Sequence, residues 1–277
     1  MSAISDRYDR AAERYGMWWA PVLQATAVRV LDRLAPDLPR GADGLRILDI
    51  GTGTGTLALE AVRKWPHVAV TAADASRGMI AAAQGRANRT LTRPELDRLA
   101  LAVGEADRLP YDDATFDAAI SSFVFQLVPD RMAAFEEAHR VVRPGGTFAF
   151  VTWMVSSRPF PPDEAFFDVV DELEIPDEES APEDRSGDFV SARSAADQLR
   201  RVGFRSVRSR EETLEYQFDP ARYVDFLEQY GEYDLFRSLD RRLRGRLRER
   251  SSERLATLPR TAFTWQAPVV MVVARRP

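Results

Sequence analysis

Residues 45–57 of this chain read Leu-Arg-Ile-Leu-Asp-Ile-Gly-Thr-Gly-Thr-Gly-Thr-Leu. The first half of this stretch is a short apolar run, which predicts a buried parallel strand. After the glycines, residues 57–62 resume the apolar pattern at helical spacing. A strand, a glycine turn and a helix start form a corner where backbone N–H groups point at a ligand and glycines let it approach closely. The stretch therefore predicts an α/β fold with a ligand site at the turn.

The spacing of the glycines narrows the choice of ligand. A dinucleotide fingerprint requires Gly-x-Gly-x-x-Gly, but Thr56 stands where its third glycine belongs. A phosphate loop requires Gly-Lys-Ser/Thr, and the only lysine of the chain, Lys64, lies outside the turn. The carboxylate of Asp49, just before the glycines, suits a ligand with an ammonium group better than a pyrophosphate.

The pattern acid-x-Gly-x-Gly-x-Gly resembles the first motif of class I S-adenosylmethionine (SAM)-dependent methyltransferases. Residues 8–15, residues 104–111 and the Arg-Pro-Gly-Gly turn at 143–146 resemble segments of the ubiquinone/menaquinone-type members. The resemblance implies a seven-stranded, Rossmann-like, doubly wound sheet whose last strand is antiparallel. It also implies SAM as cofactor, S-adenosylhomocysteine as product, and no metal.

The second predicted strand, residues 68–73, ends at Asp74, where one carboxylate can accept hydrogen bonds from both hydroxyls of a ribose. Ser76 is expected to cap the next helix, with Met79 facing back to the site. In the family the acid at Glu105 bonds the adenine amino group, and residues 8–15 close over the cofactor; simple packing of an amphipathic helix is the alternative for that segment. The predicted cofactor contacts are Tyr8, Tyr15, Asp49, Gly51, Thr52, Gly53, Gly55, Asp74, Ala75, Met79, Glu105, Ala106, Ser121 and Phe123.

The remaining strands are predicted at 99–103, 117–122, 147–153, 207–218 and 263–274. The cofactor-binding core with its N-terminal helices is expected at 1–154, its next helix and strand at 192–218, and its final strand at 262–277. Two insertions remain, an acidic one at 155–191 and a helical one at 219–261. In open α/β sheets ligands lie outside the carboxyl ends of the strands, so we expect these insertions to form a lid over the site.

Aromatic side chains of the lid and of the core are expected to line an acceptor pocket. The predicted acceptor contacts are Trp18, Trp19, Gln126, Trp153, Phe166, Tyr223, Phe226 and Tyr230. In the second insertion Phe236, Leu239, Leu243 and Leu247 are spaced three or four apart, which predicts one amphipathic helix. Its arginines could face solvent, pair with the acidic insertion, or bind a membrane surface or nucleic acid.

Methyl transfer from a sulfonium is a direct displacement that needs alignment and exclusion of water more than covalent machinery. The acceptor is expected to be a small, hydrophobic or aromatic metabolite with an O, N or C nucleophile. No general base stands out; the candidates are Glu228, Tyr230, Glu232 and Tyr233. The alternative is a methyltransferase-fold protein that binds SAM without transferring its methyl group.

The composition excludes several other classes of site. The chain has 277 residues, no cysteine, two histidines and a net charge of −5. Disulfides, thiolate metal sites and cysteine nucleophiles are therefore excluded, and a histidine-based metal site is disfavoured. With no apolar window long enough to span a bilayer, no signal peptide and a negative charge, we expect a cytoplasmic protein that binds no nucleic acid; its oligomeric state stays open.

Overall fold

The computed structural model describes residues 3–38, 44–176 and 184–277. The chain forms two compact units, which are described separately. Unit 1 contains residues up to Val155, residues 183–212 and residues 268–277. Unit 2 contains residues 156–182 and 213–267, so that the last two strands each run from one unit into the other. Of the predicted acidic insertion, residues 177–183 lie outside the described residues.

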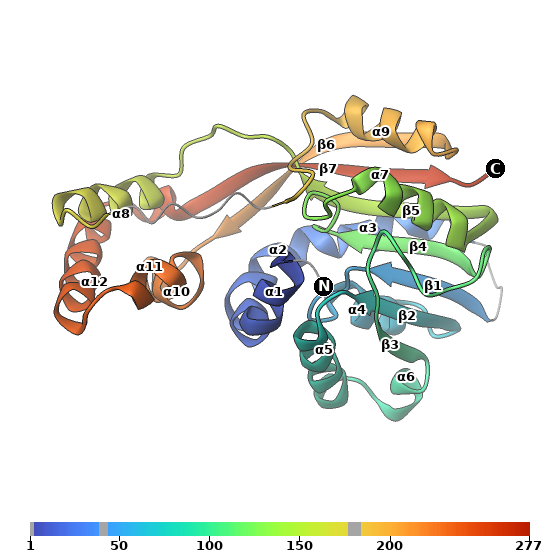
Figure 1. The fold of residues 1–277 in the computed structure, drawn as a ribbon, viewed down its shortest axis with the longest axis horizontal. Coiled ribbons are helices and arrows are strands. Elements are labelled where there is room, and N and C mark those ends of the chain that lie inside the picture. Colours follow the sequence, from blue (N-terminus) through green and yellow to red (C-terminus); the bar gives the residue numbers. More distant parts are fainter. Residues whose placement is uncertain (1–2, 39–43, 177–183) are drawn as a thin grey trace. The chain divides into compact units, whose positions relative to one another are not determined.

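Unit 1 is built around a seven-stranded sheet with the order β3-β2-β1-β4-β5-β7-β6 (Figure 1). Neighbours among β1 to β5 pair in parallel, whereas β7 runs antiparallel to β5 from Thr147↔Arg275 to Trp153↔Val269. The strands are β1 (Leu45–Ile50), β2 (Val68–Asp74), β3 (Leu99–Val103), β4 (Phe116–Ser122), β5 (Val142–Trp153), β6 (Arg205–Gln217) and β7 (Thr264–Arg275). The predicted sheet and its antiparallel last strand are confirmed.

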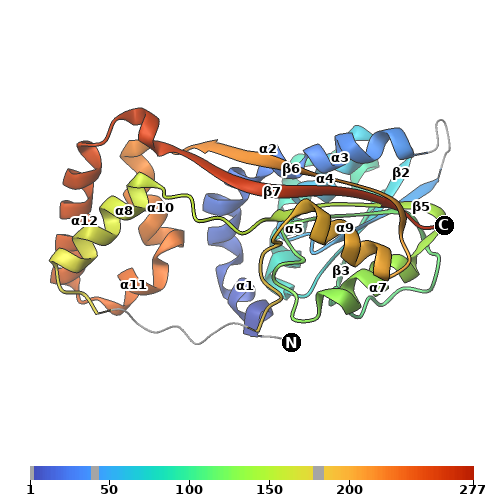
Figure 2. The ribbon, with the colours of Figure 1, turned by 90° about the horizontal axis from the view of Figure 1, so that it is seen from above.

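Helices cover both faces of this sheet because the strand order reverses after β3. From β1 the chain steps outward to β2 and then β3, and it returns to β4 on the other side of β1. Because both kinds of crossover are right-handed, the helices of the outward steps and of the later steps lie on opposite faces. Figure 2 shows α4 (Thr56–Lys64) on one side of β5 and β7, and α7 (Arg131–Val141) with α9 (Ala192–Arg201) beside it on the other. Helix α5 (Arg77–Thr90) packs on β2 and β3. The remaining helices of unit 1 are α1 (Ala3–Arg14), the π-helix η1 (Tyr15–Trp19), α2 (Ala20–Ala27), α3 (Arg29–Leu34), η2 (Ala35–Asp37) and α6 (Arg93–Leu96).

The core between α7, α9 and the sheet is aromatic. The ring of Phe125 contacts those of Phe135, Phe148 and Phe150 at centroid distances between 4.7 and 5.6 Å. All four side chains are fully buried. Each phenylalanine buried in this way stabilises the fold by about 1.5–3 kcal/mol relative to exposure, so this cluster fixes β4 and β5 firmly against α7.

Unit 2 consists of helices together with the last residues of β6 and the first residues of β7. Its helices are α8 (Pro161–Glu172), η3 (Pro220–Arg222), α10 (Tyr223–Phe226), the π-helix η4 (Leu227–Gly231), α11 (Tyr233–Ser238), α12 (Arg241–Ala256) and η5 (Arg260–Phe263). Arg254 of α12 pairs with Asp168 and Glu172 of α8. Arg254 lies beyond the helix whose arginines were predicted to face solvent, pair with the acidic insertion or bind another molecule; of those arginines, Arg248 pairs with Asp225 and Glu228 of the second insertion itself.

The single amphipathic helix predicted from Phe236 to Leu247 is wrong. Helix α11 ends at Ser238, Leu239 is extended at ψ 144°, and α12 begins after Asp240. The carboxylate of Asp240 accepts from Leu243 N at 2.8 Å and caps the new helix. An aspartate competes for backbone N–H groups and favours an N-cap over a helix interior, which explains the break within an unbroken apolar spacing.

None of the helices in the described part of the chain is both long and apolar enough to cross a bilayer.

Candidate functional site

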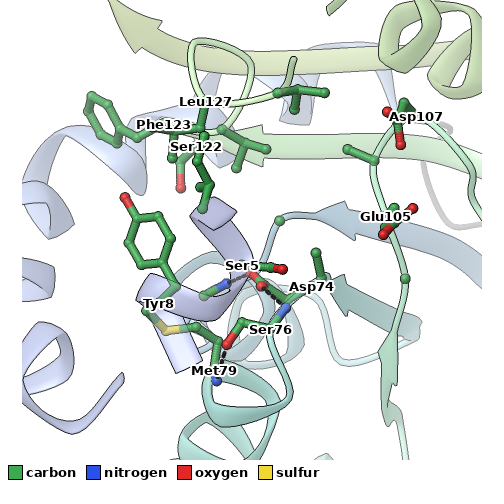
Figure 3. A pocket seen from close by; sticks show the side chains of 18 of the residues that line it. Ser5, Tyr8, Asp74, Ser76, Met79, Glu105, Asp107, Ser122, Phe123 and Leu127 are labelled. Atoms are coloured by element: carbon green, nitrogen blue, oxygen red, sulfur yellow. Dashed lines mark hydrogen bonds between the residues drawn. The ribbon is translucent and has the colours of Figure 1, made fainter. Parts of the chain in front are cut away.

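The site lies in unit 1, at the carboxyl ends of the strands where the sheet order reverses. The turn after β1 and the turn after β4 flank this switch point, which is where open α/β sheets bind ligands. A pocket opens there, and α1 covers part of it. Its lining residues are Ile4, Ser5, Tyr8, Tyr15, Gly51, Gly53, Asp74, Ala75, Ser76, Met79, Gly104, Glu105, Ala106, Asp107, Ser122, Phe123, Val124, Leu127, Val128 and Pro129. In Figure 3, Tyr8 and Phe123 lie at one end, Glu105 and Asp107 at the other, and Asp74 between them.

The glycine turn needs its glycines for two different reasons. Gly51 and Gly53 have φ of +68° and +54°, a region that other residues enter only with strain. A Cβ on Gly51 would stand 2.3 Å from Val124 Cγ2, so the turns after β1 and β4 touch at this residue. Apart from its chain neighbours, a Cβ on Gly53 would meet no atom of the described residues closer than Tyr15 Cε1 at 3.8 Å, so space beside the pocket is open to it.

Asp74 joins the glycine turn to the start of α5. One carboxylate oxygen accepts from Gly53 N at 2.8 Å and the other from Ser76 N at 2.9 Å. Burial raises the pKa of Asp74, and these two hydrogen bonds oppose that rise. Each oxygen accepts two hydrogen bonds when fully satisfied, so each retains capacity toward the pocket. The predicted position of Asp74 at the end of β2 is confirmed.

Asp49 lies behind the turn and outside the pocket lining. Its side chain is 1% exposed; Oδ2 accepts from Thr52 Oγ1 at 2.6 Å and from Ala58 N at 3.1 Å, while Oδ1 has no partner. Burial raises its pKa to about 7, against the two hydrogen bonds and with a smaller contribution from Asp74. Asp49 therefore stabilises the turn through hydrogen bonds to Thr52 and Ala58, and its carboxyl group ionises near neutral pH.

Helix α1 is fastened to α5 by Asp9. The Asp9 carboxylate accepts from Ser76 Oγ at 2.5 Å and from Gly78 N at 2.8 Å, and these bonds lower its pKa. The same Ser76 Oγ accepts from Met79 N at 3.0 Å, which confirms Ser76 as the cap of α5. This fastening holds Tyr8 of α1 against the pocket.

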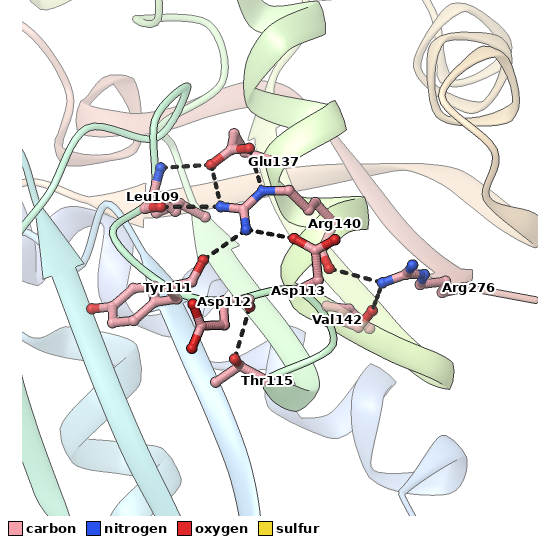
Figure 4. Close-up of polar contacts among 9 residues, drawn as sticks. All are labelled: Leu109, Tyr111, Asp112, Asp113, Thr115, Glu137, Arg140, Val142 and Arg276. Carbon is pink, nitrogen blue, oxygen red and sulfur yellow. Dashed lines mark hydrogen bonds and ion pairs between the residues drawn. The ribbon is translucent and has the colours of Figure 1, made fainter.

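The acidic end of the pocket is held by a network on α7 (Figure 4). Arg140 donates to Leu109 O at 3.1 Å and to Tyr111 O at 2.7 Å, while Glu137 accepts from Leu109 N at 2.7 Å. Glu137 and Arg140 also pair directly, which lowers the pKa of Glu137. The loop that carries Glu105 and Asp107 is therefore anchored at its far side, away from the pocket.

The opposite end of the pocket is aromatic. Phe123 follows β4 directly, and its ring contacts that of Trp153 at 4.4 Å between centroids. Ser121 is fully buried and donates to Ile50 O at 2.7 Å, so it ties β4 to β1 behind the lining. Gln126 is 2% exposed and likewise lies behind the lining.

Most of the predicted cofactor contacts line one pocket. Those that do are Tyr8, Tyr15, Gly51, Gly53, Asp74, Ala75, Met79, Glu105, Ala106 and Phe123, whereas Asp49, Thr52, Gly55 and Ser121 support it from behind. The sequence analysis missed mainly the turn after β4 (Val124, Leu127, Val128 and Pro129) and Asp107. The signal was available, because this turn follows a strand next to β1 in every sheet of this order.

The charge of the pocket has one sign. Asp74, Glu105 and Asp107 line it, and within the described residues no Lys, Arg or His side chain does. Three carboxylates without a cation favour a positively charged ligand and disfavour a pyrophosphate. No group of three or more His, Asp or Glu residues in the described chain is arranged to hold a metal ion.

The predicted acceptor residues of unit 2 form its own core. Phe166, Tyr223 and Phe226 are 0%, 2% and 8% exposed. Phe166 stacks on Phe236 at 5.9 Å, and the ring of Phe226 lies 6.2 Å from that of Tyr230. Such burial leaves little of these side chains for a ligand, and their contact with an acceptor stays a prediction, as do those of Trp18 and Trp19 on η1.

Two of the four candidate bases differ sharply. Glu228 pairs with Arg248 at 2.5 Å. Glu232 is partly buried, and burial together with the charge of Asp163 raises its pKa to about 7. Tyr223 donates to Asp163 nearby, so unit 2 encloses a group of acidic side chains. A carboxyl with a pKa near 7 is suited to proton transfer near neutral pH.

Comparison with known proteins agrees with this geometry. Residues 47–146 match a family described as a methyltransferase domain. A malonyl-[acyl-carrier protein] O-methyltransferase of Geobacter sulfurreducens is 30% identical over 229 residues, which are 82% of this chain and 80% of that protein. A ubiquinone/menaquinone biosynthesis C-methyltransferase of the same organism is 35% identical over 144 residues, which are 52% of this chain and 55% of that protein.

Among solved structures, Haemonchus contortus phosphoethanolamine N-methyltransferase 2, in complex with phosphomonomethylethanolamine and S-adenosylhomocysteine, is similar with a TM-score of 0.59. The match covers 97% of this chain and 57% of that one at 18% identity, a likeness that concerns the fold.

Proposed function

The chain belongs to the class I SAM-dependent methyltransferases of the ubiquinone/menaquinone type, and on that premise we propose that it methylates an O, N or C nucleophile of a small, hydrophobic or aromatic metabolite. Its cofactor is SAM. The observation that carries the proposal is the pocket of unit 1, which is lined by three carboxylates and an aromatic end and by no basic side chain of the described residues.

The lining fits SAM residue by residue. Asp74 retains acceptor capacity toward the pocket after bonding Gly53 and Ser76, so it can accept both ribose hydroxyls. Glu105 would accept from the adenine amino group at the acidic end, and Met79 would pack on the adenine face. The glycine turn would hold the methionine part, whose ammonium the buried carboxyl of Asp49 favours when it is ionised.

The aromatic end would then face the reacting group. When bound, SAM supplies a methyl carbon on a positively charged sulfur, and the acceptor's nucleophile takes this carbon while the S–C electron pair stays on sulfur. Tyr8 and Phe123 lie at that end and favour a cation through their ring faces. They also exclude water from the line of transfer.

The chemistry of the pocket wall supports the class of acceptor. Ile4, Val124, Leu127 and Val128 add apolar surface to the pocket lining. With no cation in the lining of the described residues, an acceptor carboxylate would find no partner in this pocket, whereas a neutral ring would bury favourably. Since the relatives are named as methyltransferases, transfer is favoured over the predicted alternative of binding without transfer.

The experiment is a transfer assay with radiolabelled SAM against a panel of acceptors. The panel contains a naphthoquinol, a simple phenol, an aromatic amine, a free carboxylic acid and malonyl-acyl carrier protein, the last two chosen as carboxylates. Label on the quinol or phenol supports the proposal. Label on the carboxylates alone contradicts the neutral acceptor, and a protein that does not bind SAM in calorimetry contradicts the site itself.

A further inference from the structure

Phe123 carries backbone strain at the wall of the pocket. Its φ is +58°, in the left-handed region, and bulky aromatic residues occupy that region only when the surroundings enforce it. Phe123 lines the pocket and is 6% exposed. Strain at such a position therefore raises the question of which groups hold the backbone there.

Two hydrogen bonds hold the backbone of Phe123, one on each of the two peptide groups that flank its Cα. Its N–H donates to Val151 O at 2.8 Å, and its carbonyl accepts from Gln126 Nε2 at 2.7 Å. The second bond joins the side chain of Gln126 to the backbone carbonyl three residues earlier, so it closes the turn of residues 123–126. Without it, the Phe123 carbonyl would lose its side-chain partner in a buried setting, and the left-handed conformation would lose its support.

Gln126 is itself fixed by a second buried group. Its Oε1 accepts from Thr152 Oγ1, and Thr152 is 0% exposed on β5. Rotating the amide would bring Nε2 to a hydroxyl and Oε1 against the Phe123 carbonyl, so only one orientation satisfies both partners. The backbone carbonyl of Gln126 also accepts from Gly187 N at 3.0 Å.

Leucine has a volume similar to that of glutamine, so packing alone does not require an amide at position 126. Burying an amide costs free energy unless both of its polar atoms are bonded. Here both are bonded, and one of the bonds ends on the strained residue. Phe123 in turn contacts Trp153, and its neighbour Val124 touches Gly51 of the glycine turn.

We propose that Gln126 is a positioning residue: its amide, oriented by Thr152, keeps Phe123 in the left-handed conformation and so sets the aromatic wall where the methyl-bearing sulfur of SAM lies. This rests on the proposed function for the place of SAM in the pocket. Gln126 was expected to contact the acceptor, and it acts instead through Phe123 from behind the lining.

The test compares SAM with S-adenosylhomocysteine, which lacks the methyl group and the positive charge but shares every other part. Gln126→Leu removes both hydrogen bonds at similar volume. It should raise the Kd of SAM about tenfold, while the Kd of S-adenosylhomocysteine changes about threefold or less, as measured by titration calorimetry. Thr26→Val, which removes a buried hydroxyl on α2 outside the pocket lining, is the control and should leave both values unchanged.

A cycle with Phe123 separates positioning from general loosening. In a Phe123→Gly background the left-handed conformation costs nothing, so adding Gln126→Leu should change the SAM Kd about twofold or less. Fluorine NMR of 5-fluorotryptophan protein supplies a readout without ligand: the Trp153 signal, identified by its loss in Trp153→Phe, should move in Gln126→Leu and stay in Thr26→Val.

Should Gln126→Leu fail to fold, Thr152→Val gives the same comparison, because it frees Gln126 without touching its bond to Phe123, and it should shift Kd in the same direction by less. Equal weakening of SAM and S-adenosylhomocysteine, or full additivity with Phe123→Gly, overturns the inference and leaves SAM binding by the native chain intact. A native chain that binds neither compound overturns the proposed function, and this inference with it.

Discussion

The glycine turn of unit 1 and the helical unit 2 use acidic side chains in opposite ways. In unit 1, Asp9 and Asp74 each accept backbone N–H groups and retain a fixed place beside a pocket. In unit 2, Asp168 and Glu172 pair with Arg254 across helices, and the aromatic side chains close on one another. The first arrangement leaves the carboxylate of Asp74 in the lining of a pocket, whereas the second pairs its carboxylates within the unit.

That difference separates carboxylates that can bind a ligand from carboxylates that stabilise the fold. A carboxylate held by backbone donors keeps lone pairs for a ligand, and its position is set by the chain path. A carboxylate in an exposed ion pair contributes about 0–1 kcal/mol and no recognition.

Gly53→Val should abolish detectable SAM binding. The φ of +54° strains any β-branched residue, and the new side chain would project beside the pocket rather than into protein. Gly145→Val is the matched control, because Gly145 has φ +78° and nothing within 4 Å of its Cβ. Both variants should lose about 1–3 kcal/mol of stability, but only Gly53→Val should lose binding in calorimetry. Equal binding by the two would place the ligand away from the turn.

Asp74→Ala should weaken SAM binding by roughly 2–4 kcal/mol, the loss expected for charge-assisted hydrogen bonds. It also frees Gly53 N and Ser76 N, so part of the loss comes from a looser turn. Asp117→Ala is the control, since Asp117 also accepts a backbone N–H, from Arg46, but at the start of β4. Calorimetry should show unchanged SAM affinity for Asp117→Ala. An unchanged affinity for Asp74→Ala would contradict the assignment of the ribose to this residue.

The glycine turn, the end of β2 and the start of α5 could be predicted from sequence, because their backbone geometry dictates which residues can stand there. Three glycines with positive φ, an acid at the end of β2 and a serine cap each leave a local signature. The turn after β4 left a weaker signature, because Phe123 at φ +58° is held by Gln126, and Gln126 is held by Thr152, which follows it by 26 residues. Strain imposed by a distant partner cannot be seen in a local pattern.

Unit 2 was harder to predict for a related reason. Apolar spacing indicated one helix through Leu239, but the single capping bond of Asp240 divided it. Spacing also could not tell whether Tyr223 lines a ligand site or a core, since both uses require a buried aromatic side chain. Only the packing of the rings on one another distinguishes them.

Asp49→Asn should flatten the pH dependence of SAM affinity. With a pKa near 7, the Asp49 carboxyl is neutral at pH 6 and ionised at pH 8, and SAM, a cation, favours the ionised form. The Kd of the native chain should therefore fall as pH rises through 7, by at most about tenfold per unit. In Asp49→Asn the amide oxygen can still accept from Thr52 and Ala58, and Kd should change little. A native Kd that is constant between pH 6 and 8 would contradict ionisation of Asp49 on binding.

Glu232→Gln is expected to have the smallest effect, on the pH dependence of stability. The pKa of Glu232 is raised from its ordinary 4.5 to about 7 by burial and by Asp163. A raised carboxyl pKa means that the folded chain binds the proton more tightly, so this contribution to stability is complete below pH 4.5 and is lost as pH rises through 7. The Tm of the native chain should thus fall between pH 6 and pH 8 by more than that of Glu232→Gln, which stays neutral throughout.

Glu249→Gln supplies the control, since Glu249 is an exposed carboxyl on α12, and its Tm should follow the native chain at every pH. The pKa of Asp49 of unit 1 is also raised to about 7 and contributes a slope of the same sign, so the variant should reduce the fall in Tm without removing it. An identical fall in the native chain and in Glu232→Gln would mean that Glu232 is ionised throughout this range. Its carboxyl would then lack the pKa near 7 that suits proton transfer at neutral pH, and the acidic side chains enclosed in unit 2 would serve its structure alone.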